Sequence, residues 1–171
     1  DFALQLTGRV QSPSPVPFAP YQQRWTGYFN RLYAHLRLYC IDITAGIQPI
    51  VYESVDPLLS SGSMIFSGNS QPLPRVTIGI EQYIPFPGCY GYMEIKGGLT
   101  HAWMADNVYI QGGYLHHKFL GLRFGGQLPV NLSYEFHHAA EWGGISPVYG
   151  DVGSDFRSFL NVLMAKGGGT M

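Results

Sequence analysis

The sequence predicts an all-β protein of long antiparallel strands, and it favours a transmembrane β-barrel over a soluble sandwich. Three features support this prediction: alternating apolar and polar side chains, strand segments of barrel length, and few charges. In segment 130–142 one parity holds Val130, Leu132, Tyr134, Phe136, Ala140 and Trp142, and the other holds Asn131, Ser133, Glu135, His137 and Glu141. Because successive strand side chains point to opposite faces, this segment has one apolar and one polar face. Its length matches the roughly 9–11 residues with which a tilted strand crosses a bilayer.

Composition limits the possible classes of protein. The chain has 171 residues, of which 46% are hydrophobic and 12% charged, whereas an average soluble domain is about 25% charged. The net charge of −1 gives no reason to expect a nucleic-acid partner. No apolar run approaches the roughly 18 residues of a transmembrane helix, so a membrane span would have to be made of strands.

The predicted strands follow one another along the chain. We expect them over residues 2–10, 28–42, 75–86, 90–104, 114–124 and 129–142. A weaker strand is expected over 45–52, because Pro49 cannot donate a ladder hydrogen bond. In segment 114–124 the apolar parity also carries His116 and Lys118, and a β-bulge there would resolve the conflict.

One short helix is expected near the C-terminus, over about residues 155–165. Phe156, Phe159, Leu160 and Leu163 recur with helical spacing. Ser154 or Asp155 can cap this helix, and Lys166-Gly167 suits its end.

The alternation assigns side chains to the two faces of the predicted sheet. The residues expected to face lipid are Val76, Ile78, Ile80, Leu132, Tyr134 and Phe136. The residues expected to face a lumen are Arg75, Thr77, Asn131, Ser133 and Glu135. Trp25, Trp103 and Trp142 are candidates for the aromatic girdles that flank the apolar band of a barrel.

A soluble β-sandwich remains the alternative fold, because alternation also occurs where one face covers a core and the other meets water. Two observations favour the barrel. Soluble strands average about five or six residues, and several segments here are about twice as long. The polar faces of the predicted strands also carry many Tyr, Gly, Thr and Asn and few Lys or Glu, unlike the surface of a soluble protein.

The ends of the sequence suggest a mature protein or part of a longer one. The chain opens inside the strand 2–10, and Asp1-Phe2-Ala3-Leu4 has neither the basic start nor the apolar region of a signal peptide, although a barrel needs export. No closing strand follows the predicted helix. We therefore expect residues 1–171 to form a single β-barrel domain or a fragment of a larger barrel. Cys40 and Cys89 are expected as free thiols, with a disulfide as the alternative.

No catalytic residue, metal site or cofactor site is expected. On a strand His137 and Glu141 share a face but lie about 13 Å apart, which is too far for one metal ion. There is no metal-type cysteine spacing, no H-E-x-x-H motif and no G-x-S-x-G elbow. Glu81 and Glu94 could form a glycosidase pair across neighbouring strands. A polar lumen balanced by Arg75 and Lys96 is the favoured interpretation of these carboxylates.

Several local motifs resemble the Wzi-like capsule assembly family of outer-membrane proteins. They are Gly68-Asn69-Ser70 with Pro72-Leu73-Pro74-Arg75-Val76, Leu115-His116-His117-Lys118, Leu128-Pro129-Val130-Asn131-Leu132-Ser133-Tyr134, His138-Ala139-Ala140-Glu141-Trp142-Gly143-Gly144 and Lys166-Gly167-Gly168-Gly169. The resemblance covers roughly residues 68–171, whereas residues 1–67 match only in style. His117 stands where the family pattern has Glu.

The resemblance implies a β-barrel in the bacterial outer membrane that binds capsular polysaccharide, helps to keep it on the cell surface and is not an enzyme. Its implied partners are surface polysaccharide, outer-membrane lipid and other outer-membrane proteins. The barrels of this family are larger than these residues could form. The resemblance assigns no binding residue. From their place on the polar face of the predicted strands alone, we expect Arg123, Glu135, His137 and Glu141 to contact glycan. An outer-membrane porin or uptake channel is the main alternative, and an outer-membrane hydrolase is a third.

Overall fold

The computed structural model describes residues 2–11, 24–49, 65, 71–104, 110–126 and 128–166. Contacts between Cα atoms divide the chain into two compact units. The first, residues 1–34 and 46–72, contains strand β1 (Phe2–Gln11) and most of β2 (Arg24–Leu38). The second, residues 35–45 and 73–171, contains the end of β2, most of β3 (Ile41–Ile47) and every later element.

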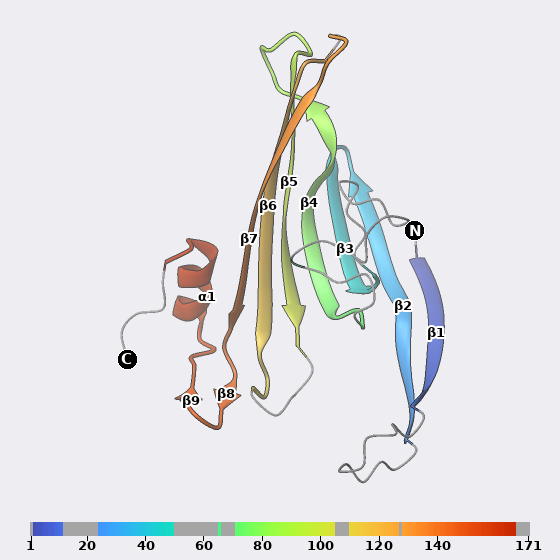
Figure 1. The fold of residues 1–171 in the computed structure, drawn as a ribbon, viewed down its shortest axis with the longest axis vertical. Helices are drawn as coiled ribbons and strands as arrows, with labels where there is room; N and C mark the ends of the chain where they lie inside the picture. Colours follow the sequence, from blue (N-terminus) through green and yellow to red (C-terminus); the bar gives the residue numbers. More distant parts are fainter. Residues whose placement is uncertain are drawn as a thin grey trace. The chain divides into compact units, whose positions relative to one another are not determined.

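The strands form an antiparallel sheet in which neighbours in the chain are neighbours in space. Its later strands are β4 (Pro74–Pro85), β5 (Met93–Trp103), β6 (Tyr114–Phe124) and β7 (Leu132–Trp142). The order runs β1-β2-β3-β4-β5-β6-β7, and in Figure 1 β4 to β7 lie side by side. The predicted antiparallel all-β fold is confirmed, and five of the expected strands match within a few residues.

The sheet is open. Strands β1 and β7 stand at the two ends of the strand order, and among the described strands they do not pair. A closed barrel would require that pairing, so the closed form of the predicted barrel is not present in these strands. No helix within the described ranges has the length and apolar character needed to cross a membrane.

The expected single strand over 28–42 is wrong, because the chain reverses at Tyr39-Cys40. Tyr39 adopts a left-handed conformation with φ of 62°, which a two-residue hairpin turn requires. Asp42 on β3 is buried and accepts hydrogen bonds from Arg37 Nε at 2.6 Å and from His35 Nε2 at 2.9 Å. These bonds join the two strands next to the turn. The strand expected over 45–52 consequently begins at Ile41, and residues 50–52 lie outside the described ranges.

The expected bulge in β6 is also wrong. Strand β6 pairs with β5 and with β7 without a register shift, because the helix described below covers His116 and Lys118 and no bulge has to turn them away. Register shifts occur instead in β4, between Ile80 and Ile84, and in β1, between Gln5 and Leu6. Gln82, which interrupts the apolar parity of β4, is inside the shift in that strand.

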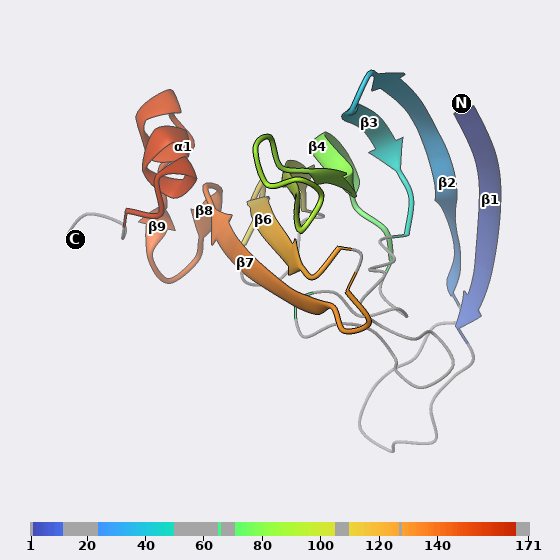
Figure 2. The same ribbon diagram turned by 90° about the horizontal axis from the view of Figure 1, so that it is seen from above.

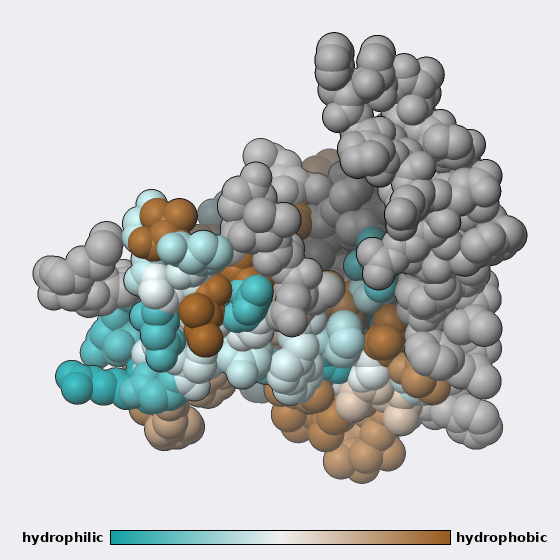
Figure 3. All heavy atoms as spheres, turned by 90° about the horizontal axis from the view of Figure 1, so that it is seen from below, coloured by the Kyte–Doolittle hydropathy of each residue, from teal (hydrophilic) through white to brown (hydrophobic). Residues whose placement is uncertain are grey.

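The two faces of β4 to β7 differ in chemistry and in exposure. On the polar face Arg75, Thr77, Lys96 and Thr100 are buried, whereas the apolar face is open, with Leu132 69% exposed. The exposed residues of the apolar face include Val76, Ile78, Leu120, Leu132, Tyr134 and Phe136. Among the described side chains Ala102 is the only buried hydrophobic residue. The predicted division of side chains between two faces is confirmed in β4 to β7, and Figure 3 shows apolar side chains, in brown, gathered along one margin.

After β7 the chain forms a two-strand hairpin, β8 (Ile145–Ser146) with β9 (Gly150–Asp151), and then helix α1 (Phe156–Leu163). The predicted helix is confirmed. Asp155 caps it by accepting a hydrogen bond from the Ser158 backbone N–H at 3.1 Å. Hydrogen bonding to Ser158, first to its side chain and then to its backbone, lowers the pKa of the Asp155 carboxyl. Figures 1 and 2 both show α1 next to β7.

The turn at Tyr39 provides a first test. A left-handed conformation costs a residue with a side chain roughly 1–2 kcal/mol, and Asn tolerates it better. Because the Tyr39 side chain is fully exposed, Tyr39→Asn should lose little contact and raise the free energy of unfolding by about 0.5–1 kcal/mol. Urea unfolding of the purified protein measures this change. Tyr149→Asn, at an exposed position with ordinary backbone, should give no gain; equal gains at both sites would contradict the turn geometry.

Candidate functional site

A polar network centred on Glu135 lies on the polar face of β4 to β7. The register places Lys96 on β5 and Glu135 on β7 on either side of Gly121 of β6. Lys96 Nζ and Glu135 Oε1 are 2.6 Å apart, and Lys96 is only 7% exposed. The two side chains therefore form a buried ion pair that passes over the middle strand.

Gly121 leaves room for this ion pair. A Cβ atom at position 121 would lie 2.8 Å from Lys96 Cγ and 3.0 Å from the Tyr83 hydroxyl oxygen. The first separation is shorter than real Cβ contacts, and the second is tighter than most of them. A residue with a side chain at this position would push Lys96 and Tyr83 away from Glu135, so the glycine is part of the construction of the network.

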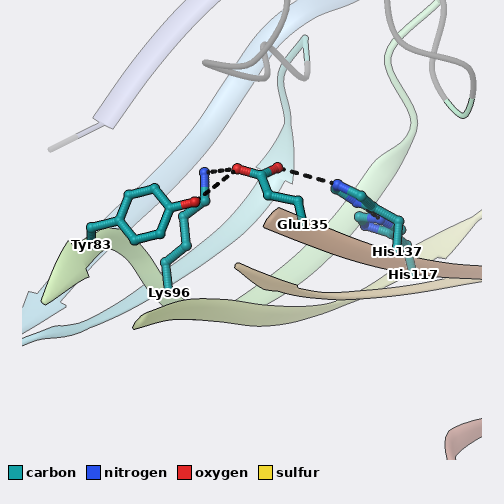
Figure 4. A network of polar contacts seen from close by, with 5 residues as sticks. All are labelled: Tyr83, Lys96, His117, Glu135 and His137. Carbon is teal, nitrogen blue, oxygen red and sulfur yellow. Dashed lines mark hydrogen bonds and ion pairs between the residues drawn. The ribbon is translucent and has the colours of Figure 1, made fainter. Parts of the chain in front are cut away.

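Tyr83, on β4, contacts the residue at the centre of the network. Its hydroxyl donates to Glu135 Oε1 at 3.3 Å. Two cations lie over its ring, with Lys96 Nζ at 4.7 Å and Arg123 Cζ at 4.4 Å from the ring centroid. These distances are within the range of cation–π attraction. Figure 4 shows Tyr83 and Lys96 approaching Glu135 from the same side.

Two histidines continue the network along β7 and β6. His137 Nε2 lies 3.3 Å from Glu135 Oε2, and His137 Nδ1 lies 3.1 Å from His117 Nε2. Since an ionised carboxylate only accepts, His137 donates through Nε2, and in a neutral ring Nδ1 then accepts from the Nε2–H of His117. The two rings stack with centroids 5.4 Å apart. The partners thus fix one tautomer for each neutral imidazole.

Arg123 and Glu94 form a second ion pair beside the first. They lie directly opposite each other on β6 and β5, and Arg123 Nε donates to Glu94 Oε2 at 2.5 Å. This pair is more exposed than the pair of Lys96 with Glu135. On the polar face Lys96 therefore neutralises Glu135, as its predicted role in charge balance requires, and Arg123 neutralises Glu94.

The structure brings together three of the four residues predicted to contact glycan. Arg123, Glu135 and His137 all belong to the network, with Arg123 joined through Tyr83. Glu141 is exposed at the other end of β7, opposite Leu115. There it lines a groove of about 400 Å³ beside α1.

Sequence reasoning missed Tyr83, Lys96 and His117 as members of this group. All three lie on predicted strands, but only the register shows which residues of different strands meet. The register also opposes Pro85, not Glu81, to Glu94, so the suggested carboxylate pair of Glu81 with Glu94 is wrong. His116 and His117 point to opposite faces as expected, with His117 stacked on His137 and His116 next to His138.

The network offers fixed hydrogen-bonding groups around an aromatic ring. Such a combination suits a ligand rich in hydroxyl groups, which needs donors and acceptors beside a flat apolar surface. Among the described residues no group of three or more His, Cys, Asp or Glu side chains is arranged to hold a metal ion. Comparisons with protein-family models, with curated proteins and with solved structures found no match.

The buried ion pair can be tested by a double-mutant cycle. Lys96→Met should leave the part-buried Glu135 carboxylate without its cation and lower the free energy of unfolding by about 1–3 kcal/mol. Lys96→Met combined with Glu135→Leu should cost much less than the sum of the two single changes. Urea unfolding gives all three values. Lys166→Met, at an exposed position, should be neutral; additive losses in the cycle would contradict the pairing.

Proposed function

We propose that this chain forms the wall of an outer-membrane β-barrel of the Wzi-like capsule assembly class and binds surface polysaccharide without altering it chemically. One observation supports the membrane location most strongly. In water an antiparallel sheet turns its apolar face to the core, whereas here the apolar face is largely exposed and the polar face is buried around Arg75, Lys96 and His117. Lipid is the solvent in which this inverted arrangement is stable, because the outer surface of a barrel is apolar and its interior polar.

An aromatic row supports the same location. Trp103, Tyr114 and Trp142 stand directly opposite one another on β5, β6 and β7. Trp and Tyr at one level across neighbouring strands are typical of the interface between lipid and water. The side chain of Trp25, the third predicted girdle residue, lies outside the described residues.

The length of the apolar face also fits a bilayer. From the aromatic row to the other end of β5 the strand has 11 residues, or roughly 33 Å at about 3.3 Å per residue. A strand tilt of about 40° reduces this to roughly 25 Å, the height of the apolar band of outer-membrane barrels. The open edges of the sheet accord with a wall that further strands complete.

The polysaccharide part of the proposal rests on the motifs between residues 68 and 171 and on the polar network. Glu135 and Arg123 are ion-paired and His137 is held in one tautomer, so these groups are suited to fixed hydrogen bonds rather than to proton transfer. Tyr83 adds a ring on the same face. We propose that glycan contacts this face near Tyr83, Arg123 and His137, and that Glu141 contributes only at a separate position.

Charge on the apolar face tests the membrane location. Phe136→Arg should impair assembly into membranes, because an arginine at mid-membrane costs roughly 2–4 kcal/mol. Ser133→Arg, on the polar face of the same strand, should be tolerated because Glu135 lies two residues away on that face. The yield of heat-modifiable, membrane-extracted protein measures both variants. If Phe136→Arg assembles as well as Ser133→Arg, the apolar face does not meet lipid.

Deletion of the gene in a capsulated host tests the role in capsule attachment. Polysaccharide should appear in the medium while its total amount is unchanged, since attachment and not synthesis is lost. The purified protein should retain the glycan at its original chain length and should not conduct ions in a planar bilayer. Shortened glycan would favour a hydrolase, steady conductance would favour a channel, and capsule that stays on deleted cells would contradict the proposal.

A further inference from the structure

Polar residues interrupt the apolar face of the sheet close to the aromatic row. His101 lies opposite His116, and Lys118 lies opposite His138, all on the face that carries Leu120 and the other apolar side chains. Ionisable side chains exposed to hydrocarbon are costly and rare. A wall that meets lipid therefore needs something to cover this polar patch, defined here as His101, His116, Lys118 and His138.

Helix α1 covers the patch. The ring of Phe159 lies 5.9 Å from that of His101 and 6.3 Å from that of His116, centroid to centroid. His116 is completely buried. Lys118 Nζ donates to the Leu163 carbonyl oxygen at 2.5 Å, so the lysine neutralises the C-terminal end of the helix, where backbone carbonyls are unpaired and the dipole is negative.

A second side of α1, next to the one that carries Phe159, is apolar and uncovered. Phe156, Leu160 and Met164 follow one another at intervals of four residues, which places them in one row along a helix. All three are exposed, with Phe156 at 73%. The hairpin before the helix adds further exposed apolar side chains, namely Ile145, Val148, Tyr149 and Val152. The segment from β8 to α1 thus presents an apolar surface to its surroundings.

We propose that α1 is an interfacial helix, which seals the polar patch with one side and lies in the lipid headgroup region with the other. The inference rests on the proposed membrane location. Its partner is lipid because the row of Phe156, Leu160 and Met164 continues the apolar face of the sheet at the level of the aromatic row, where Phe159 lies 5.8 Å from Trp142, centroid to centroid. Amphipathic helices with Phe and Leu on one side dock in this way.

Fluorescent probes distinguish this inference from the membrane location itself. In a background of Cys40→Ser and Cys89→Ser, a single cysteine is introduced as Leu160→Cys on α1, Leu120→Cys on the apolar face or Ser133→Cys on the polar face, and is labelled with a polarity-sensitive dye. The full chain is reconstituted into vesicles with and without brominated lipid. Brominated lipid should quench the probes at 160 and 120 to a similar extent, with blue-shifted emission, and should leave the probe at 133 unquenched.

Each outcome has a defined meaning. Lipid quenching at 120 together with full iodide quenching at 160 would overturn the interfacial helix and leave the barrel proposal intact. Absence of lipid quenching at both positions would overturn both. A probe at 160 that is shielded from iodide and from lipid, and becomes accessible on dilution of the protein in the vesicles, would show that a second copy or another protein covers α1 and would contradict the lipid assignment.

Discussion

The strict alternation of strand side chains is the constraint on which this structure depends. A residue on β4 to β7 faces one side or the other with no intermediate choice, so separating apolar from polar side chains in the sequence creates two chemically different surfaces. The structure exposes much of the apolar surface and buries the middle of the polar one, around Lys96 and His117. This separation creates two problems: charges gather on the polar face, and some polar side chains interrupt the apolar face. The ion pairs solve the first problem, and helix α1 solves the second.

The first problem is that a polar face contains charges that must be neutralised at close range. The sheet solves it across strands: Lys96 reaches Glu135 over Gly121, and Arg123 meets Glu94 directly. A buried pair of this kind contributes little net stability compared with an apolar replacement, but loss of one partner is costly. The network therefore specifies which side of the sheet is polar and fixes its register more than it stabilises the fold.

The parity of the strands could be predicted from the sequence, because period-two alternation is a local property. The register could not, because Lys96, Gly121 and Glu135 lie on three strands and nothing local says that they align. The turn at Tyr39-Cys40 was missed because neither residue type is typical of turns, and the buried Asp42 that joins the two strands is recognised only in space. His116 and Lys118 suggested a bulge, since the sequence does not reveal that α1 covers them.

The central claim is that the two faces of β4 to β7 meet different solvents, with lipid on one side and a polar interior on the other. Spin labels placed one at a time along β7, from residue 132 to residue 137, outside the part that α1 covers, test it most directly in reconstituted bilayers. Collision with oxygen, which concentrates in lipid, should peak at the even positions of the apolar face, and collision with a water-soluble nickel complex should peak at the odd positions. Strong collision of the nickel complex with labels at the even positions would contradict the claim.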